Sequence, residues 1–504
     1  MSEPIVETIH GRVRGFQGDD VLAFLGVPYG ASTAGEGRFK APQPPAPWPG
    51  IRDAVELAPV AFQSSDRPGA RAGVKAVMSE DCLTLNIWTP SLQGARPVVV
   101  WFHGGGFISG EAVSAESHGA ALAGLGDVVT VNVTHRLGML GFLHLEEIGG
   151  EQYSGSGNAA SLDMQLSLEW VRDNIARFGG DPGAVTVHGH SGGGGKTALL
   201  ASMPGTRGLL HRSVVHGGPP FGFKDHAAAT DNAEEALAIL GLGPGDLQAL
   251  ADLPIERLMH LQRQLGAGDG PGPNGMRFAP VFGTRELPAD PYQMFAAGCA
   301  RDIEFMTGTA KDESRAAISA FPHYLTDAEM TDGELVERLR PGVDDPNDAE
   351  TLVERYREIL PDPNNGEIFF AVTSDQFTIR SLRLADAKKA GDGQDSWVYL
   401  CTANQSSPLR AFHGVQMPLF FNNVDDATPA GSVAPEVGAE FTRFAYGELS
   451  LSDSWRSYRR DEPEMLVIDE DGIRSESSPL ADRVVAWDGI VVTPRTDPWT
   501  TLWE

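Results

Sequence analysis

The sequence predicts an α/β protein in which helices cover both faces of a large, mostly parallel sheet. Short apolar runs rich in β-branched residues recur along the chain, and turn residues bound most of them. The apolar residues in these runs do not alternate with polar ones, so the strands are expected to be buried on both faces. An amphipathic helical segment separates two of the runs, and repeated strand–helix–strand units favour a parallel sheet.

Five runs carry the strand prediction. In chain order they are Val98 to Phe102, Val128 to Val133, Val185 to His188, Ser213 to Val215, and Trp397 to Cys401. Between the second and third runs, apolar residues recur at helical spacing, at Met164, Leu168, Val171, Ile175 and Phe178. Gly179 and Gly180 then provide a natural helix end.

Two further segments, residues 225–265 and 325–360, are amphipathic and are predicted to be helical, whereas residues 265–275 form a Gly/Pro loop. No change of composition separates one part of the chain from another. Residues 1–504 are therefore expected to form one domain.

Charge and hydropathy exclude several classes of partner. The 504 residues include 68 acidic and 39 basic ones, a net charge of −29 that repels nucleic acid and anionic membranes. The longest apolar runs are far shorter than the ~20 residues of a membrane span, and the N-terminus lacks a signal-peptide profile. We expect a cytoplasmic protein, a monomer or homodimer, without nucleic-acid or membrane partners.

The cysteines indicate neither a disulfide framework nor a metal site. Cys82, Cys299 and Cys401 are odd in number, far apart and without Cys/His ligand spacing. No metal and no cofactor are expected.

The strongest chemical signal is the stretch 185–197, VTVHGHSGGGGKT, in which a β-branched run ends at Gly189-His190-Ser191-Gly192-Gly193 and a helix-compatible segment follows. A GxSxG sequence between a strand and a helix is typical of a nucleophile elbow, where small residues permit a sharp turn. Ser191 is therefore the candidate nucleophile, and the amide of Gly192 is expected to face the same space.

Two other interpretations of this stretch stay open from its residues alone. The ending Gly195-Lys196-Thr197 fits a phosphate-binding loop, but His190 stands where that motif needs its first glycine. The stretch could also be a tight glycine turn with an exposed serine.

A second glycine-rich loop, His103-Gly104-Gly105-Gly106-Phe107, follows the first buried run. Successive glycines leave backbone amides free to face a cavity, which is what an oxyanion hole requires. Gly105, Gly106 and Gly192 are the expected donors, although an ordinary glycine-rich loop has the same composition.

These motifs resemble the type B carboxylesterase family, which includes cholinesterases and bacterial para-nitrobenzyl esterases. The resemblance is carried by EDCLTLNIW at 80–88, by the HGGGF loop, and by FGGDP at 178–182 leading into GHSGG. It begins at GVPY (26–29), continues through RLG (136–138) and WVRDNI (170–175), and covers nearly the whole chain. The resemblance implies an α/β-hydrolase fold with a catalytic triad in the order serine, acid, histidine.

A serine hydroxyl needs a neutral imidazole to take its proton, and a carboxylate must orient that imidazole. Residues 306–313, MTGTAKDE, match the family's GxxxDEG pattern at the acidic pair, so Glu313 is the expected acid and Asp312 the runner-up. An exposed acidic loop is the alternative for both. Among thirteen histidines, His413 lies in a loop after the run ending at Cys401, where the family places its base.

The sequence departs from the family at several positions near the site. His190 replaces the usual glutamate, and Gly192 replaces the usual alanine, a loss of a methyl group that is expected to widen the site. His216 stands where the family often has serine. His190 is expected to point away from Ser191 as a buried supporting group rather than to act as the base.

The sequence therefore predicts a serine hydrolase that cleaves small carboxylic esters through an acyl-enzyme. Amide or carbamate cleavage by the same triad is one alternative, and a non-catalytic recognition module on the same fold is the other. The substrate is expected to meet apolar walls, which we assign to Phe107, Phe221, Phe223 and Phe278.

Overall fold

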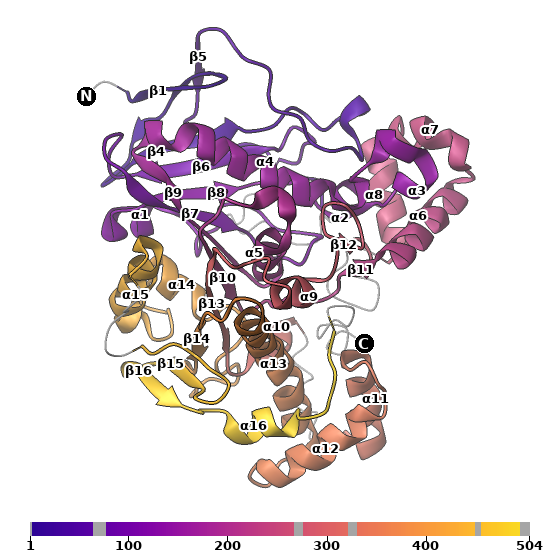
Figure 1. Cartoon of the computed structure of the whole chain (residues 1–504), viewed down its shortest axis with the longest axis vertical. Helices are drawn as coiled ribbons and strands as arrows, with labels where there is room; N and C mark the ends of the chain where they lie inside the picture. Colours follow the sequence, from indigo (N-terminus) through magenta and orange to yellow (C-terminus); the bar gives the residue numbers. More distant parts are fainter. Residues whose placement is uncertain (1–2, 64–76, 267–275, 321–329, 449–454, 494–504) are drawn as a thin grey trace.

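A single extended sheet forms the centre of the computed structural model, which describes residues 3–63, 77–266, 276–320, 330–448 and 455–493 (Figure 1). Eleven strands make up this sheet. From one edge to the other they are β16 (Gly472–Ser477), β15 (Glu464–Asp469), β14 (Trp397–Cys401), β13 (Glu304–Ala310), β10 (Arg212–His216), β9 (Gly180–His190), β7 (Arg96–Phe102), β8 (Val129–Val133), β6 (Thr84–Thr89), β4 (Leu22–Pro28) and β3 (Phe16–Gln17).

The sheet is mostly parallel, as predicted. Every neighbouring pair from β15 across to β8 runs parallel. Antiparallel pairs occur only towards the two edges, where β16 pairs with β15 and where β8, β6, β4 and β3 pair in turn. All five predicted runs are strands, and β14 has the predicted bounds.

Two smaller sheets lie outside the central one. The first contains β1 (Ile5–Thr8), β2 (Gly11–Arg14) and β5 (Ile51–Asp53), and the second pairs β11 (Lys224–Asp225) with β12 (Val281–Phe282).

Helices cover both faces of the central sheet, and the alternation of side chains along β7 explains why. Val98 and Val100 belong to the core that contains side chains of α4 (Ala159–Asn174) and α5 (Gly192–Ser202). Val99 and Trp101 point the other way, into a core with α1 (Ala120–Gly126), α14 (Met417–Phe421) and α15 (Ala434–Tyr446). Both faces of the strand are buried, which accounts for its uninterrupted apolar sequence.

The predicted helix between the second and third runs is α4. Its apolar periodicity continues beyond Asn174 as a 3₁₀ turn over Ile175–Phe178, and Gly179 then ends the segment with a φ of 79°. This left-handed conformation is the one for which glycine is favoured at a helix end.

The remaining helices include those predicted between 225 and 265 and between 325 and 360. Residues 267–275 of the predicted Gly/Pro loop and residues 325–329 of the second helical segment lie outside the described residues. The helices are α2 (Gly138–Phe142), α3 (Glu146–Gly149), α6 (His226–Leu240), α7 (Leu247–Ala251), α8 (Ile255–Gln264), α9 (Pro291–Ala296), α10 (Ala317–Ala320), α11 (Asp332–Leu339), α12 (Asp348–Ile359), α13 (Asn365–Asp392) and α16 (Ala481–Ala486).

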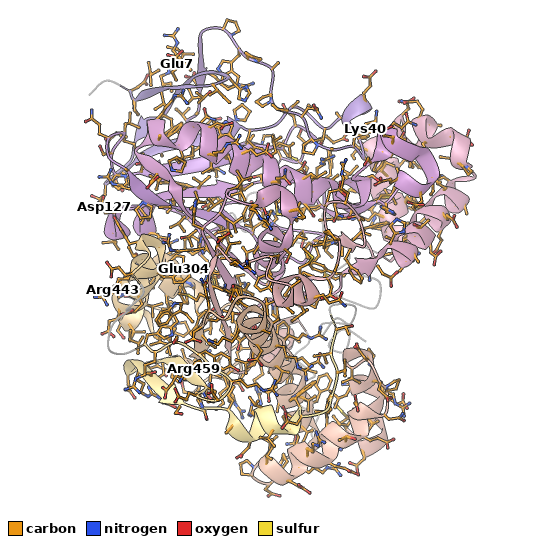
Figure 2. All side chains as sticks on the ribbon, in the orientation of Figure 1. Glu7, Lys40, Asp127, Glu304, Arg443 and Arg459 are labelled. Atoms are coloured by element: carbon orange, nitrogen blue, oxygen red, sulfur yellow. The ribbon has the colours of Figure 1, made fainter. Side chains whose placement is uncertain are left out.

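Side chains fill the space between the sheet and its helices, while charged residues such as Glu7 and Arg443 lie at the outer edge (Figure 2). Cys82, Cys299 and Cys401 are all unpaired thiols, as the sequence predicted. Among the described helices, none combines the length and the apolar character that a membrane crossing requires.

Candidate active site

Ser191 occupies the sharp turn between β9 and α5. Its backbone has a φ of 61° and a ψ of −129°, a conformation that is strained for any residue other than glycine. The turn is held from both sides, because the Ser191 amide donates to the carbonyl of His216 at 2.9 Å and the Ser191 carbonyl accepts from the Gly194 amide at 2.8 Å. This strand–turn–helix geometry is the one that the GxSxG sequence requires.

The two outer glycines of this motif allow backbone segments to approach closely. A Cβ atom added to Gly189 would lie 2.4 Å from the Gly193 carbonyl oxygen, and one added to Gly193 would lie 2.2 Å from the carbonyl oxygen of Phe102. No side chain fits at either position without displacing backbone.

The HGGGF loop lies directly against the elbow. It leaves the end of β7, which neighbours β9 in the sheet. A Cβ atom on Gly104 would be 2.7 Å from the His190 carbonyl oxygen and 3.3 Å from the Ser191 Cβ. Among the described residues, no hydrogen bond is formed by the amides of Gly105, Gly106 and Gly192.

The expectation that Gly192 widens the site is wrong. A Cβ atom on Gly192 would lie 2.2 Å from the carbonyl oxygen of Gly106 and 2.5 Å from its Cα. The backbone of the HGGGF loop therefore occupies the space that the family's usual alanine methyl would fill.

Glu313 and His413 form a close pair beside this turn. The Nδ1 atom of His413 lies 2.5 Å from Oε2 of Glu313, and the His413 amide donates to the Glu313 carbonyl at 3.2 Å. The other carboxylate oxygen, Oε1, accepts a hydrogen bond of 2.8 Å from the Ala310 amide at the end of β13. Both carboxylate oxygens are thus held in place.

Burial dominates the electrostatics of this pair. Glu313 is fully buried, which raises the pKa of its carboxyl group, and burial lowers the pKa of His413. Burial therefore favours the neutral imidazole of His413.

Asp312, the alternative acid, faces elsewhere. Its Oδ2 accepts a hydrogen bond of 3.2 Å from Gln405, and Arg315 and Arg410 lie 3.8 and 3.9 Å from its Oδ1. Glu313 is the member of the acidic pair that meets His413. Ser314, which replaces the family's usual glycine, donates to the Phe370 carbonyl and thereby attaches this loop to α13.

His190 packs against the ring of His413. The two ring centroids are 4.2 Å apart, and polar atoms of His190, His413 and Glu313 all lie within 4.8 Å of one another. Burial lowers the pKa of His190. Because the two histidines are far apart in the sequence, the motif around Ser191 could not reveal this contact.

The second position singled out near the elbow, His216, has side-chain contacts with aromatic residues. Its Nδ1 pairs with the Tyr399 hydroxyl at 2.9 Å, and its ring packs on Phe420 with centroids 4.6 Å apart.

The four phenylalanines assigned to the substrate walls, Phe107, Phe221, Phe223 and Phe278, are all buried in the main core. Phe107 packs on Phe223 with ring centroids 5.6 Å apart. Phe221 contacts Phe377, whose ring in turn lies 5.7 Å from that of His413. The sequence did not indicate Phe377, because it lies in the stretch 368–382 of α13, where every residue is buried.

Lys196 removes the phosphate-loop interpretation of the GKT ending. It is fully buried on α5, and its Nζ donates to the His103 carbonyl at 2.8 Å, below the HGGGF loop. Burial lowers the pKa of Lys196 to about 7. A lysine that binds phosphate must reach its ligand, whereas this one supports the loop from inside the protein.

The sheet order, the elbow after β9 and the acid after β13 define an α/β-hydrolase. A family model described as the carboxylesterase family matches residues 2–483. The chain belongs to the carboxylesterase family and is a carboxylic ester hydrolase.

Relatives match almost the full chain. The para-nitrobenzyl esterase of Bacillus subtilis (strain 168) is 30% identical, and the match covers 96% of this chain and 98% of that protein. The phenmedipham hydrolase of Pseudarthrobacter oxydans is also 30% identical, with 94% and 96% covered. A crystal structure of a Geobacillus stearothermophilus carboxylesterase superposes with a TM-score of 0.83 at 30% identity, covering 96% of this chain and 99% of that one.

Proposed function

We propose that the chain hydrolyses small carboxylic esters in two steps, with Ser191 as nucleophile, His413 as general base and Glu313 as the group that orients His413. The observation that carries this proposal is the 2.5 Å contact between Glu313 and His413 next to the strained turn of Ser191. The amides of Gly105, Gly106 and Gly192 are the proposed donors to the oxyanion.

The Glu313 contact determines which imidazole nitrogen takes the proton. When Nδ1 donates its hydrogen to the Glu313 carboxylate, Nε2 becomes the basic nitrogen. A neutral imidazole in this tautomer accepts the proton of the serine hydroxyl as its oxygen attacks the ester carbonyl. Burial of the ring supports this role, because it disfavours the imidazolium form that cannot accept a proton.

The reaction then proceeds through an acyl-enzyme. Attack on the carbonyl gives a tetrahedral oxyanion, and its collapse breaks the ester bond while His413 returns the proton to the departing alcohol. A water molecule gives a proton to His413 as its oxygen attacks the acyl group. His413 then returns this proton to the Ser191 oxygen as the acyl–serine bond breaks, which releases the acid and regenerates Ser191. Preorganised backbone amides stabilise the oxyanion at both stages.

Substrate recognition is proposed to rest on apolar contacts from Phe107, Phe221, Phe223 and Phe278. Of these, Phe221 is supported best, because it is connected through Phe377 to the ring of His413. The single-domain organisation of residues 1–504, the cytoplasmic location and the monomeric or homodimeric state stay predictions from the sequence.

A panel of para-nitrophenyl esters of increasing acyl length tests the proposed function. Wild type is expected to hydrolyse them, and Ser191→Ala is expected to lose about 10⁶-fold in kcat. Ser91→Ala, in the loop before β7, is the matched control and should behave as wild type. Equal activity of Ser191→Ala and wild type would contradict the proposal, and an anilide and a carbamate in the same panel measure the preference for esters.

A further inference from the structure

We propose that His144, Glu147 and His226 form a binding site for a divalent transition metal of the zinc type, separate from the proposed catalytic residues. His144 follows α2, Glu147 lies in α3, and His226 is the first residue of α6. These helices lie together on one side of the molecule with α7 and α8 (Figure 1).

The three side chains converge. Each of them offers one ligand atom, and these atoms lie within 4.8 Å of one another. Nε2 of His226 is 3.1 Å from Oε1 of Glu147, and the rings of His144 and His226 have centroids 4.7 Å apart. A tetrahedral zinc ion with bonds of about 2.1 Å needs donor atoms about 3.4 Å apart, and the 3.1 Å between His226 and Glu147 is close to this spacing.

The buried ring of His144 supplies an independent reason to expect a ligand. His144 is 1% exposed, and neither of its ring nitrogens has a hydrogen-bond partner among the described residues. Two other buried histidines, His103 and His135, each pair Nδ1 with a backbone carbonyl. Buried polar atoms are nearly always satisfied in proteins, so the unsatisfied imidazole of His144 requires an explanation.

The chemistry of the three groups fits zinc. Two imidazoles and one carboxylate are a common zinc ligand set that leaves a fourth position open for water. Glu147 and His226 are partly exposed, with side-chain exposures of 52% and 38%, so an ion can reach the site from solvent.

The surrounding charge also favours a cation. The carboxylates of Glu146 and Glu286 act electrostatically on His144 in addition to that of Glu147. Oε2 of Glu286 is itself buried and has no hydrogen-bond partner among the described residues. A bound cation would link α3 to the start of α6, two segments that are far apart in the sequence, and would stabilise the folded state.

The sequence did not indicate this site, because His226 is remote from the other two residues and no short motif contains all three. The expectation that the chain has no metal site rested on cysteine and on local Cys/His spacing alone.

A zinc titration of the 504-residue chain, stripped of metal with a chelator, tests the proposal. Wild type is expected to bind about one zinc ion at this site and to gain about 2 °C in Tm when free zinc is about 100-fold above Kd. His144→Gln and His226→Gln should lose this gain. His260→Gln removes an exposed histidine on α8 and should keep it.

Two further measurements separate zinc binding at this site from misfolding of a variant and from zinc binding at the proposed catalytic residues. Glu147→Gln changes a half-exposed side chain, so it should fold normally and need about tenfold more zinc for the same Tm gain. If zinc bound instead at His190, Glu313 and His413, it would inhibit ester hydrolysis. This inhibition would be equal in wild type and in His226→Gln. A wild-type Tm that does not respond to zinc, or a response unchanged in both histidine variants, would overturn the proposal.

Discussion

Glu313 and Asp312 are adjacent acids in one loop, yet Glu313 contacts His413 whereas Asp312 contacts Gln405. The chemistry of triads did not distinguish them, and the family pattern favoured Glu313 without excluding its neighbour. The packing of the loop decides, because the Ala310 amide holds Glu313 while Asp312 faces Gln405 and two arginines.

This arrangement predicts opposite outcomes for two isosteric substitutions. Glu313→Gln removes the charge that orients and stabilises His413, so kcat for a para-nitrophenyl ester should fall by about 10⁴-fold. Asp312→Asn should keep kcat within a few-fold of wild type. The assignment of the acid would be wrong if Asp312→Asn were the more damaging variant.

The pH dependence should reflect the environment of His413. Protonated His413 cannot accept the serine proton, so activity is lost as the pH falls through its pKa in the folded protein. Burial lowers this pKa, and the midpoint of the acid limb of kcat/KM is therefore expected below the ordinary histidine value of about 6.5. A midpoint above 6.5 would contradict this account.

His190 offers a way to shift that midpoint. Its ring lies 4.2 Å from that of His413, so His190→Glu places a carboxylate beside the proposed base and should raise the midpoint by about one pH unit. His190→Gln is the uncharged control. A midpoint that is unchanged or lower in His190→Glu would contradict the expected electrostatic effect of this position on His413.

At the scale of elements, motifs confined to one segment were predictable and contacts between segments were not. The turn at Ser191 follows from five consecutive residues between a strand and a helix, so the sequence indicated it correctly. The fit of Gly192 against Gly106 joins α5 to the loop after β7, and the expectation of a wider site failed because it considered α5 alone.

Gly192→Ala restores the family's usual residue and tests this fit. The added Cβ would lie 2.2 Å from the Gly106 carbonyl oxygen, so the HGGGF loop must move and its amides lose their alignment. We expect kcat to fall by about 10²-fold with little change in KM, because the oxyanion forms only in the reaction. A kcat equal to that of wild type would show that the loop adapts freely.

At the scale of the whole molecule, the sheet's buried parallel centre was predictable, whereas its edges were not. The central strands are apolar on both faces, which gives them a distinct sequence pattern. The edge strand β16 has no buried residue and pairs only with β15, so its polar sequence resembles a loop. The order of the strands depends on long-range pairing, which no local pattern encodes.

A buried ion pair between the end of β8 and α4 is expected to contribute to global stability. Arg136 donates to both carboxylate oxygens of Asp163, at 2.6 and 2.8 Å, and the two side chains are 3% and 0% exposed. Asp163→Asn leaves a buried guanidinium without its counter-charge. It should lower the free energy of unfolding, measured by urea denaturation, by about 3–5 kcal/mol. Asp173→Asn breaks the exposed pair with Arg172 and should change the free energy of unfolding by less than about 1 kcal/mol.

Covalent labelling tests whether Ser191 is the nucleophile. A fluorophosphonate forms a stable adduct with an activated serine, and peptide mass spectrometry identifies the residue that carries it. We predict one adduct, on Ser191, formed in parallel with the loss of ester hydrolysis and absent from Ser191→Ala. Labelling of another serine together with loss of activity, or inactivation of Ser191→Ala at the wild-type rate, would contradict the claim.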